Sequence, residues 1–220
     1  MADTRSVSIT RLIIIPALIT LGITILRLVG ELHHWPALWF NPAVGGRGAL
    51  IGISWLPIIF GPYFAVKLAG AGDRPSSTGK AIGFAVLGLV VFLLAGFLFA
   101  STVSHPSNLT VVAFLLMLVA AFIPGIGWRS LGNTLVAYAF AARIPVLIVM
   151  YLAMHGNGGA GWGTHYDAVP PPLANAPLAT KFLYAGILPQ MTMWIGFTVV
   201  VGSLIGAVVA AVVRPGKRAV

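Results

Sequence analysis

The chain contains no cysteine and only four acidic residues among its 220 amino acids. The absence of cysteine excludes disulfide bonds, thiolate metal sites and iron–sulfur clusters. Charged residues make up 8% of the chain and hydrophobic residues 59%, whereas about a quarter of a soluble domain is charged. So few charged side chains could not cover a soluble surface, and we therefore interpret the chain as an integral membrane protein.

Several catalytic signatures are also missing from the sequence. It contains no P-loop, no GxSxG and no HExxH, so those nucleotide-binding, hydrolase and protease motifs give no support to an enzymatic function. Haem held by paired histidines is disfavoured too, because such ligands would lie within the spans and all five histidines lie at or beyond the span ends.

Long apolar runs divide the chain into six segments, each of about the 20 residues that a helix needs to cross a membrane. The predicted spans are residues 12–30, 49–69, 81–102, 110–126, 131–154 and 186–213. The inner loops, 70–79 and 127–130, are short, the outer face carries a long segment over 155–185, and nothing indicates a separate soluble domain. We therefore predict one polytopic membrane domain over residues 1–220, an all-α bundle of six transmembrane helices.

The Lys and Arg residues predict the orientation of this bundle. With the N-terminus inside, the outer segments hold only Arg47 and Lys181. The cytoplasmic segments hold nine basic residues, namely Arg5, Arg11, Lys67, Arg74, Lys80, Arg129, Arg214, Lys217 and Arg218. This bias predicts that both termini are cytoplasmic.

The sequence also predicts what the protein contacts and which membrane holds it. The basic residues adjoin apolar runs instead of forming a stripe, so the lipid bilayer is the predicted partner and nucleic acid is not. The short N-terminal segment has no transit-like leader, which favours a prokaryotic plasma (inner) membrane.

Arg143 is the most informative single residue of the sequence. It lies twelve residues from both Leu131 and His155, which at about 1.5 Å per residue is near the middle of the membrane. An Arg at that depth costs roughly 2.5–3.5 kcal/mol and needs a compensating partner. Freed carbonyls, polar groups such as Ser54, Thr24 or Gln190, or an anionic ligand could compensate it. Clamping of kinked helices is the structural alternative to a ligand site.

A second candidate group lies at the outer end of the first span, where Arg27, Glu31 and His34 share one helix face. Arg27 and Glu31 are spaced for an ion pair. Glu-x-x-His is also a spacing by which one helix offers a metal both a carboxylate and an imidazole. An ion pair beside an interfacial histidine is the simpler interpretation.

The outer segments hold the remaining candidates. All five histidines are predicted to lie on the outer side, and His34, His105, His155 and His165 are candidate ligands for a divalent metal. Asp167 ends a glycine-rich segment that is typical of either a ligand loop or a flexible connector. Arg47 stands among three glycines before the second span, where an anion could bind.

These residues favour a protein that binds a small or lipid-like ligand through a polar outer vestibule, with passage of that ligand across the membrane as an extension. Glu31, the histidines and Asp167 would line the mouth of the vestibule, and Arg143 would form its floor. A metal-dependent enzyme of the outer face is the alternative, and the sequence leans against it. A non-catalytic subunit of a membrane complex is a third class.

The sixth span carries small residues at a spacing of four, Gly202, Gly206 and Ala210. Small residues at this spacing let two helices approach closely. They predict either packing within the bundle or a contact in a homo-oligomer or membrane complex.

Overall fold

The structure is a computed structural model that describes residues 8–102 and 107–213. Every regular element in these two ranges is helical. The main helices are α1 (Ile9–Leu32), α2 (Leu56–Gly70), α3 (Thr78–Thr102), α4 (Asn108–Phe122), α5 (Pro124–Gly127), α6 (Arg129–Gly159), α7 (Leu178–Lys181) and α8 (Trp194–Val212). Two π-helical segments, η3 (Phe182–Ile187) and η4 (Pro189–Met193), join α7 to α8. The short 3-10 turns are η1 (Val44–Gly46) and η2 (Pro171–Leu173).

Five helical stretches are long and apolar enough to cross a membrane. They are Ile9–Leu32, Thr78–Thr102, Asn108–Gly127, Arg129–Gly159 and Leu178–Val212. Their outward surfaces are apolar as well, with Ile15 61% exposed, Leu94 65% and Phe97 78%. Large apolar side chains exposed along the full length of helices are typical of contact with lipid. The chain is therefore a multi-span helical membrane protein.

The second predicted span is only partly helical. Residues 49–55 are irregular, and α2 begins at Leu56 and is 15 residues long. Three glycines ahead of it, Gly45, Gly46 and Gly48, have positive φ, and Pro57 occupies the first turn of α2, where proline is favoured. The prediction of a full helix over 49–69 is wrong at its start because this backbone folds back toward the end of α1.

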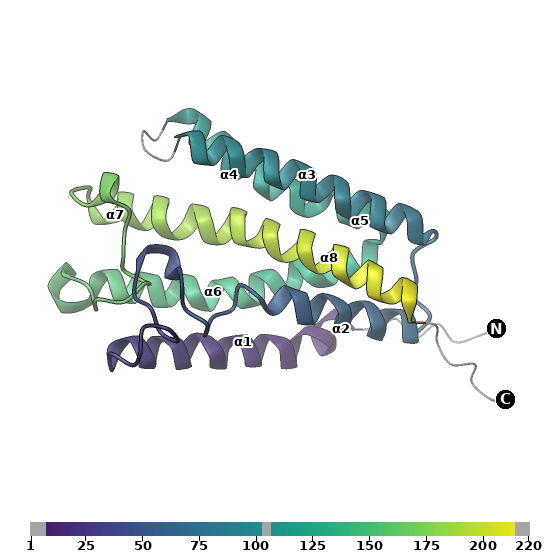
Figure 1. Cartoon of the computed structure of the whole chain (residues 1–220), viewed down its shortest axis with the longest axis horizontal. Helices are drawn as coiled ribbons and strands as arrows, with labels where there is room; N and C mark the ends of the chain where they lie inside the picture. The colour runs from purple at the N-terminus through teal and green to yellow at the C-terminus, as the bar shows by residue number, and fades with distance from the viewer. Residues whose placement is uncertain (1–7, 103–106, 214–220) are drawn as a thin grey trace.

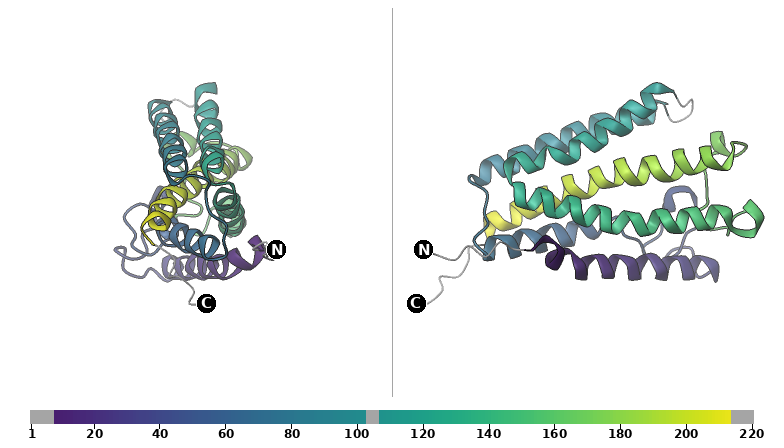
Figure 2. Two further views of the ribbon diagram at one scale, coloured as in Figure 1. Left: turned by 90° about the vertical axis from the view of Figure 1, so that its right-hand side faces the viewer. Right: turned by 180° about the vertical axis from the view of Figure 1, so that it is seen from behind.

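The bundle is arranged around α8, which contacts α2, α3, α4 and α6. Figures 1 and 2 show α3 and α4 on one side of it, and α1 and α2 on the other. Helix α6 runs beside α8 and also contacts α1. Helix α2 is short, and the irregular segment that precedes it lies beside α1 (Figure 1).

The small residues of the sixth span pack inside the chain. A Cβ added at Gly206 would collide with the Gly61 backbone of α2, one at Gly61 with the Gly202 backbone, and one at Gly202 with the Leu135 side chain of α6. Ala210 is partly buried against the same core. This confirms the prediction of packing within the bundle, and a homo-oligomer or membrane complex through this face remains a prediction.

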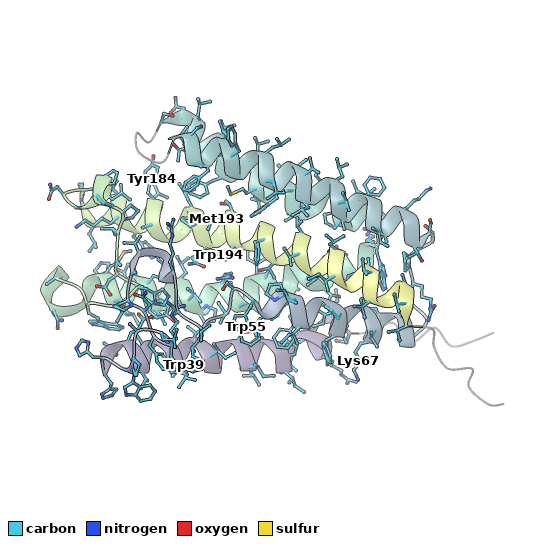
Figure 3. All side chains as sticks on the ribbon, viewed as in Figure 1. Trp39, Trp55, Lys67, Tyr184, Met193 and Trp194 are labelled. Carbon is cyan, nitrogen blue, oxygen red and sulfur yellow. The ribbon has the colours of Figure 1, made fainter. Side chains whose placement is uncertain are left out.

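The two ends of the bundle differ in the residues they carry. Helix α1 begins and α8 ends at the same end of the bundle (Figure 1). Lys67 lies toward that end and Tyr184 toward the opposite one (Figure 3). Four of the basic residues behind the predicted orientation, Arg5, Arg214, Lys217 and Arg218, lie outside the described residues.

Candidate functional site

Arg27 and Glu31 form a buried ion pair at the C-terminal end of α1. Arg27 Nε donates to Glu31 Oε1 over 2.8 Å, and the Glu31 side chain is 0% exposed. The predicted i,i+4 pairing is therefore confirmed. The guanidinium also donates from Nη2 to the carbonyl oxygens of Asn41, at 3.1 Å, and Gly46, at 3.0 Å. Arg27 thus ties the irregular segment before α2 to α1.

The histidine that meets Glu31 is His165 and not His34. Helix α1 ends at Leu32, and His34 is exposed with a left-handed φ of 52°. The prediction that His34 shares a helix face with Glu31 is wrong because the helix ends two residues too early. His165 instead approaches from the segment between α6 and α7, with its Nδ1 2.6 Å from Glu31 Oε1 and its backbone amide donating to Glu31 Oε2 over 2.8 Å.

The environment of His165 favours a neutral imidazole. Burial lowers the pKa of His165, and the charge of Arg27 lowers it further, against the opposing effects of Glu31 and Asp167. Arg27 already balances the charge of Glu31, so a second cation beside this carboxylate gains little. The neutral ring then donates from Nδ1 to Glu31, which leaves Nε2 as an acceptor.

Asp167 holds the loop that presents His165. Its carboxylate accepts the backbone amides of Gly163, at 3.0 Å, and Thr164, at 2.9 Å. Gly163 has a positive φ of 74°, a conformation that glycine adopts without strain. Tyr166, which follows His165 in the chain, is buried, and its hydroxyl donates to the carbonyl of Thr24 over 3.0 Å. Asp167 and Tyr166 therefore fix the position of His165 against α1.

Arg143 is the second buried arginine and lies on α6, 4% exposed. Its Nη1 is 3.4 Å from Gln190 Oε1, a long hydrogen bond. Its guanidinium lies over the ring of Trp194, 4.6 Å from the centroid. Nε is buried and has no hydrogen-bond partner within the residues that the structure describes. Of the groups predicted to compensate Arg143, the structure brings Gln190 into contact.

The π-helical segment explains how Gln190 and Trp194 reach Arg143. Pro189 supplies no backbone donor, and the backbone around it takes wide π-helical turns. Such turns are rare and frequently accompany functional sites. Gln190 and Trp194 are four residues apart, so both lie on the side of this helix that faces Arg143.

An apolar groove is lined in part by Trp194. It has a volume of about 430 Å³, within the range of small-molecule pockets. Figure 3 shows three of its residues, Trp55, Met193 and Trp194, near the middle of the bundle's length. Its lining side chains are Ser54, Trp55, Ile58, Phe92, Met193, Trp194 and Phe197.

The predicted site residues therefore separate into distinct places. Arg27, Glu31 and His165 come together, and Asp167 supports their loop. His155 is exposed, with Nδ1 2.7 Å from the carbonyl of Tyr151 in its own helix, and Arg47 is exposed. His105 lies outside the described residues.

A metal site remains a prediction. In residues 8–102 and 107–213, no three His, Asp or Glu side chains are grouped so that they could hold an ion. His34, His155 and His165 do not form such a group.

Sequence reasoning missed two contacts, the Trp194 ring over Arg143 and the Glu31–His165 pair. The first had a signal, since Gln190 and Trp194 are at i,i+4 after a proline in an apolar helix. The second had none, because 134 residues separate its partners.

Comparisons of the chain with protein-family models, with curated proteins and with solved structures found no match.

Proposed function

We propose that this protein is a six-span membrane protein that binds an anionic, lipid-like ligand inside its bundle, with Arg143 as the cation that attracts the ligand. Both termini are cytoplasmic in this proposal, and the host membrane is a prokaryotic plasma membrane. Passage of the ligand across the membrane is an extension, which flux into proteoliposomes would test.

The observation that carries the proposal is the incomplete set of partners around Arg143. The three described acidic residues are all engaged elsewhere: Glu31 with Arg27, Asp167 with its loop, and Asp73 with the Trp128 indole at 3.4 Å. Arg143 has one long hydrogen bond, one aromatic ring and an unpartnered Nε. A buried cation so weakly compensated in an apolar bundle favours binding of an anion.

The other candidate residues have a supporting role in this proposal. Glu31 is fully buried between Arg27 and His165, so it serves as an anchor of the outer end instead of lining an open mouth. Asp167 supports the same loop, and Arg47 is the exposed residue of the predicted set that an incoming anion would meet first.

A metal-dependent enzyme is the second candidate function, and one observation favours it. Glu31 accepts from the Nδ1 side of His165, as carboxylates behind metal-ligating histidines often do. Elemental mass spectrometry of the purified protein beside a His165→Ala variant tests this candidate. Stoichiometric metal that the variant loses would support it, and metal-free wild-type protein would refute it.

Native mass spectrometry of protein extracted in a mild detergent tests the main proposal. We expect the wild type to retain an anionic amphiphile and Arg143→Gln to lose it. Arg129→Gln is the matched control, because it removes an exposed Arg from the first residue of the same helix and should retain the ligand. The proposal fails if the wild type carries no anionic ligand and gains no thermal stability from added anionic amphiphiles.

The orientation can be tested directly because the chain has no cysteine of its own. Ser76 and Asn175 are exposed polar residues in loops at opposite ends of the bundle. We expect an impermeant thiol reagent added to intact cells to label Asn175→Cys and not Ser76→Cys. The reverse pattern would overturn the proposed orientation.

A further inference from the structure

The groove beside Trp194 indicates what shape the proposed ligand has and how it enters the protein. We propose that it receives the alkyl chain of a single-chain anionic amphiphile, a fatty carboxylate or an alkyl phosphate, which enters sideways from the membrane. Trp194 lies between this chain and Arg143. The inference rests on the proposed function, because Arg143 supplies the charge complementarity.

The lining of the groove fits an alkyl chain. Six of its seven lining side chains are apolar or aromatic, and Ser54 is the polar one. They come from the segment before α2, from α2 and α3, and from the junction of η4 with α8. Trp55 is 41% exposed and Ile58 is 49% exposed, so the groove opens at the outer surface of the bundle.

The depth of the groove determines what its opening faces. Helix α2 begins near the middle of the bundle's length (Figure 1), and the groove lies at this start. The adjacent outward side chain, Ile59, is apolar and 51% exposed. In a membrane this opening faces hydrocarbon and not water, so the occupant must arrive with an apolar part.

The same place also carries unsatisfied positive character. Within the described part of the chain, the backbone amides of Ser54 and Trp55 donate no hydrogen bond, and α2 has no side-chain cap. Irregular backbone at membrane depth is tolerated only where something covers it. The N-terminal end of a half-helix near the midplane favours an anionic group.

Trp194 joins the groove to the buried cation. Its ring stacks on the Arg143 guanidinium at 4.6 Å and meets Phe197 edge-on, with the ring centroids 5.8 Å apart. Phe197 and Trp194 both line the groove. An anionic head at this end of the groove would therefore lie one indole ring away from Arg143, and direct contact would require that ring to turn. Trp194 is a positioning residue in this arrangement.

Equilibrium binding of radiolabelled palmitate and hexadecyl phosphate, with the protein in phosphatidylcholine nanodiscs, tests the inference. Ile58→Trp fills the groove without touching Arg143, and Ile59→Trp is the matched control at a neighbouring, equally exposed position outside it. We expect Ile58→Trp to weaken binding at least about tenfold and Ile59→Trp to change it by less than about twofold. Hexadecanol, which lacks the charge, should compete weakly with the wild type and be insensitive to Arg143→Gln.

The outcomes separate the two proposals. Anion binding that requires Arg143 but is unchanged in Ile58→Trp would overturn the groove and leave the proposed function standing. Equal competition by acetate or inorganic phosphate would also overturn the inference, because an aqueous anion needs no chain. If neither radiolabelled amphiphile binds the wild type, the inference fails. The proposed role of Arg143 is then tested separately, by native mass spectrometry of the ligand that co-purifies.

Discussion

Arg27 and Arg143 are both buried in one small helical bundle, and their surroundings differ. Arg27 has a carboxylate at 2.8 Å and two backbone carbonyls within 3.1 Å. Arg143 has one amide oxygen at 3.4 Å, one indole ring and a buried Nε without a partner. The first is surrounded as a structural arginine usually is, with its charge neutralised and its donors used.

The two environments indicate which of the two arginines the fold itself requires. Removing a partner from a satisfied buried pair leaves a charge stranded in an apolar interior, which is expensive. Removing a weakly compensated charge relieves a cost that the fold already bears. Four stability measurements test this contrast.

Glu31→Gln should have the largest effect. It leaves the Arg27 charge buried without a counterion, and we expect a loss of about 3–5 kcal/mol in the free energy of unfolding. Denaturation of the detergent-solubilised protein measures it. The double variant Arg27→Met with Glu31→Gln should recover part of the loss, and a double variant less stable than Glu31→Gln alone would contradict a coupled pair.

Arg143→Met should act with the opposite sign. In ligand-free protein we expect it to raise stability by about 1–2 kcal/mol, because an apolar side chain of similar length replaces a poorly paired charge. Thermal unfolding of delipidated protein compares it with Arg27→Met, which should be destabilising. A loss of stability in Arg143→Met would show that Arg143 clamps the helices, the structural alternative to a ligand site.

The stability of the protein should depend on pH through His165, which contacts Glu31. Its pKa in the folded protein lies below the ordinary value of about 6.5, so the unfolded chain binds the proton more readily. Stability is then fully present above pH 6.5 and falls as the pH drops through 6.5 toward the folded pKa. Melting temperatures at pH 7.5 and 5.5 should differ less in His165→Asn than in the wild type, and an equal difference in the two proteins would contradict this role of His165.

Arg47→Gln should have the smallest effect. Arg47 is exposed in a glycine-rich turn, and a surface substitution of this kind changes stability by no more than about 0.5 kcal/mol. Thermal unfolding beside Arg143→Met and Glu31→Gln provides the check. A large loss would mean that Arg47 has a buried partner and belongs with Arg27 in the comparison.

The sequence allowed much of this contrast to be predicted. Local spacing predicted the Arg27–Glu31 pair, since both partners lie on one helix. Depth in an apolar run predicted that Arg143 would be buried and would need compensation, and Gln190 was among the polar groups proposed for it. Five long apolar helices matched predicted spans because hydrophobic length is a local property of the chain.

Other features could not be predicted because they depend on contacts distant in sequence. The pairing of His165 with Glu31 depends on how a glycine-rich loop folds back over α1. The irregular start of the second span looked like membrane helix because residues 49–55 are apolar. Only its tertiary neighbours, among them Arg27 at Gly46 and Gly52, make the non-helical path favourable.

The shortness of α2 has a consequence for how the chain enters the membrane during synthesis. Its 15 residues span about 22 Å at 1.5 Å per residue, less than the roughly 30 Å hydrocarbon core. Alone, it is a poor substrate for the insertion machinery. The chain before α2 is held to α1 by the carbonyls of Asn41 and Gly46, which accept from Arg27. We therefore expect α1 and α2 to insert as one unit, with the earlier helix as the surface on which the later segment packs.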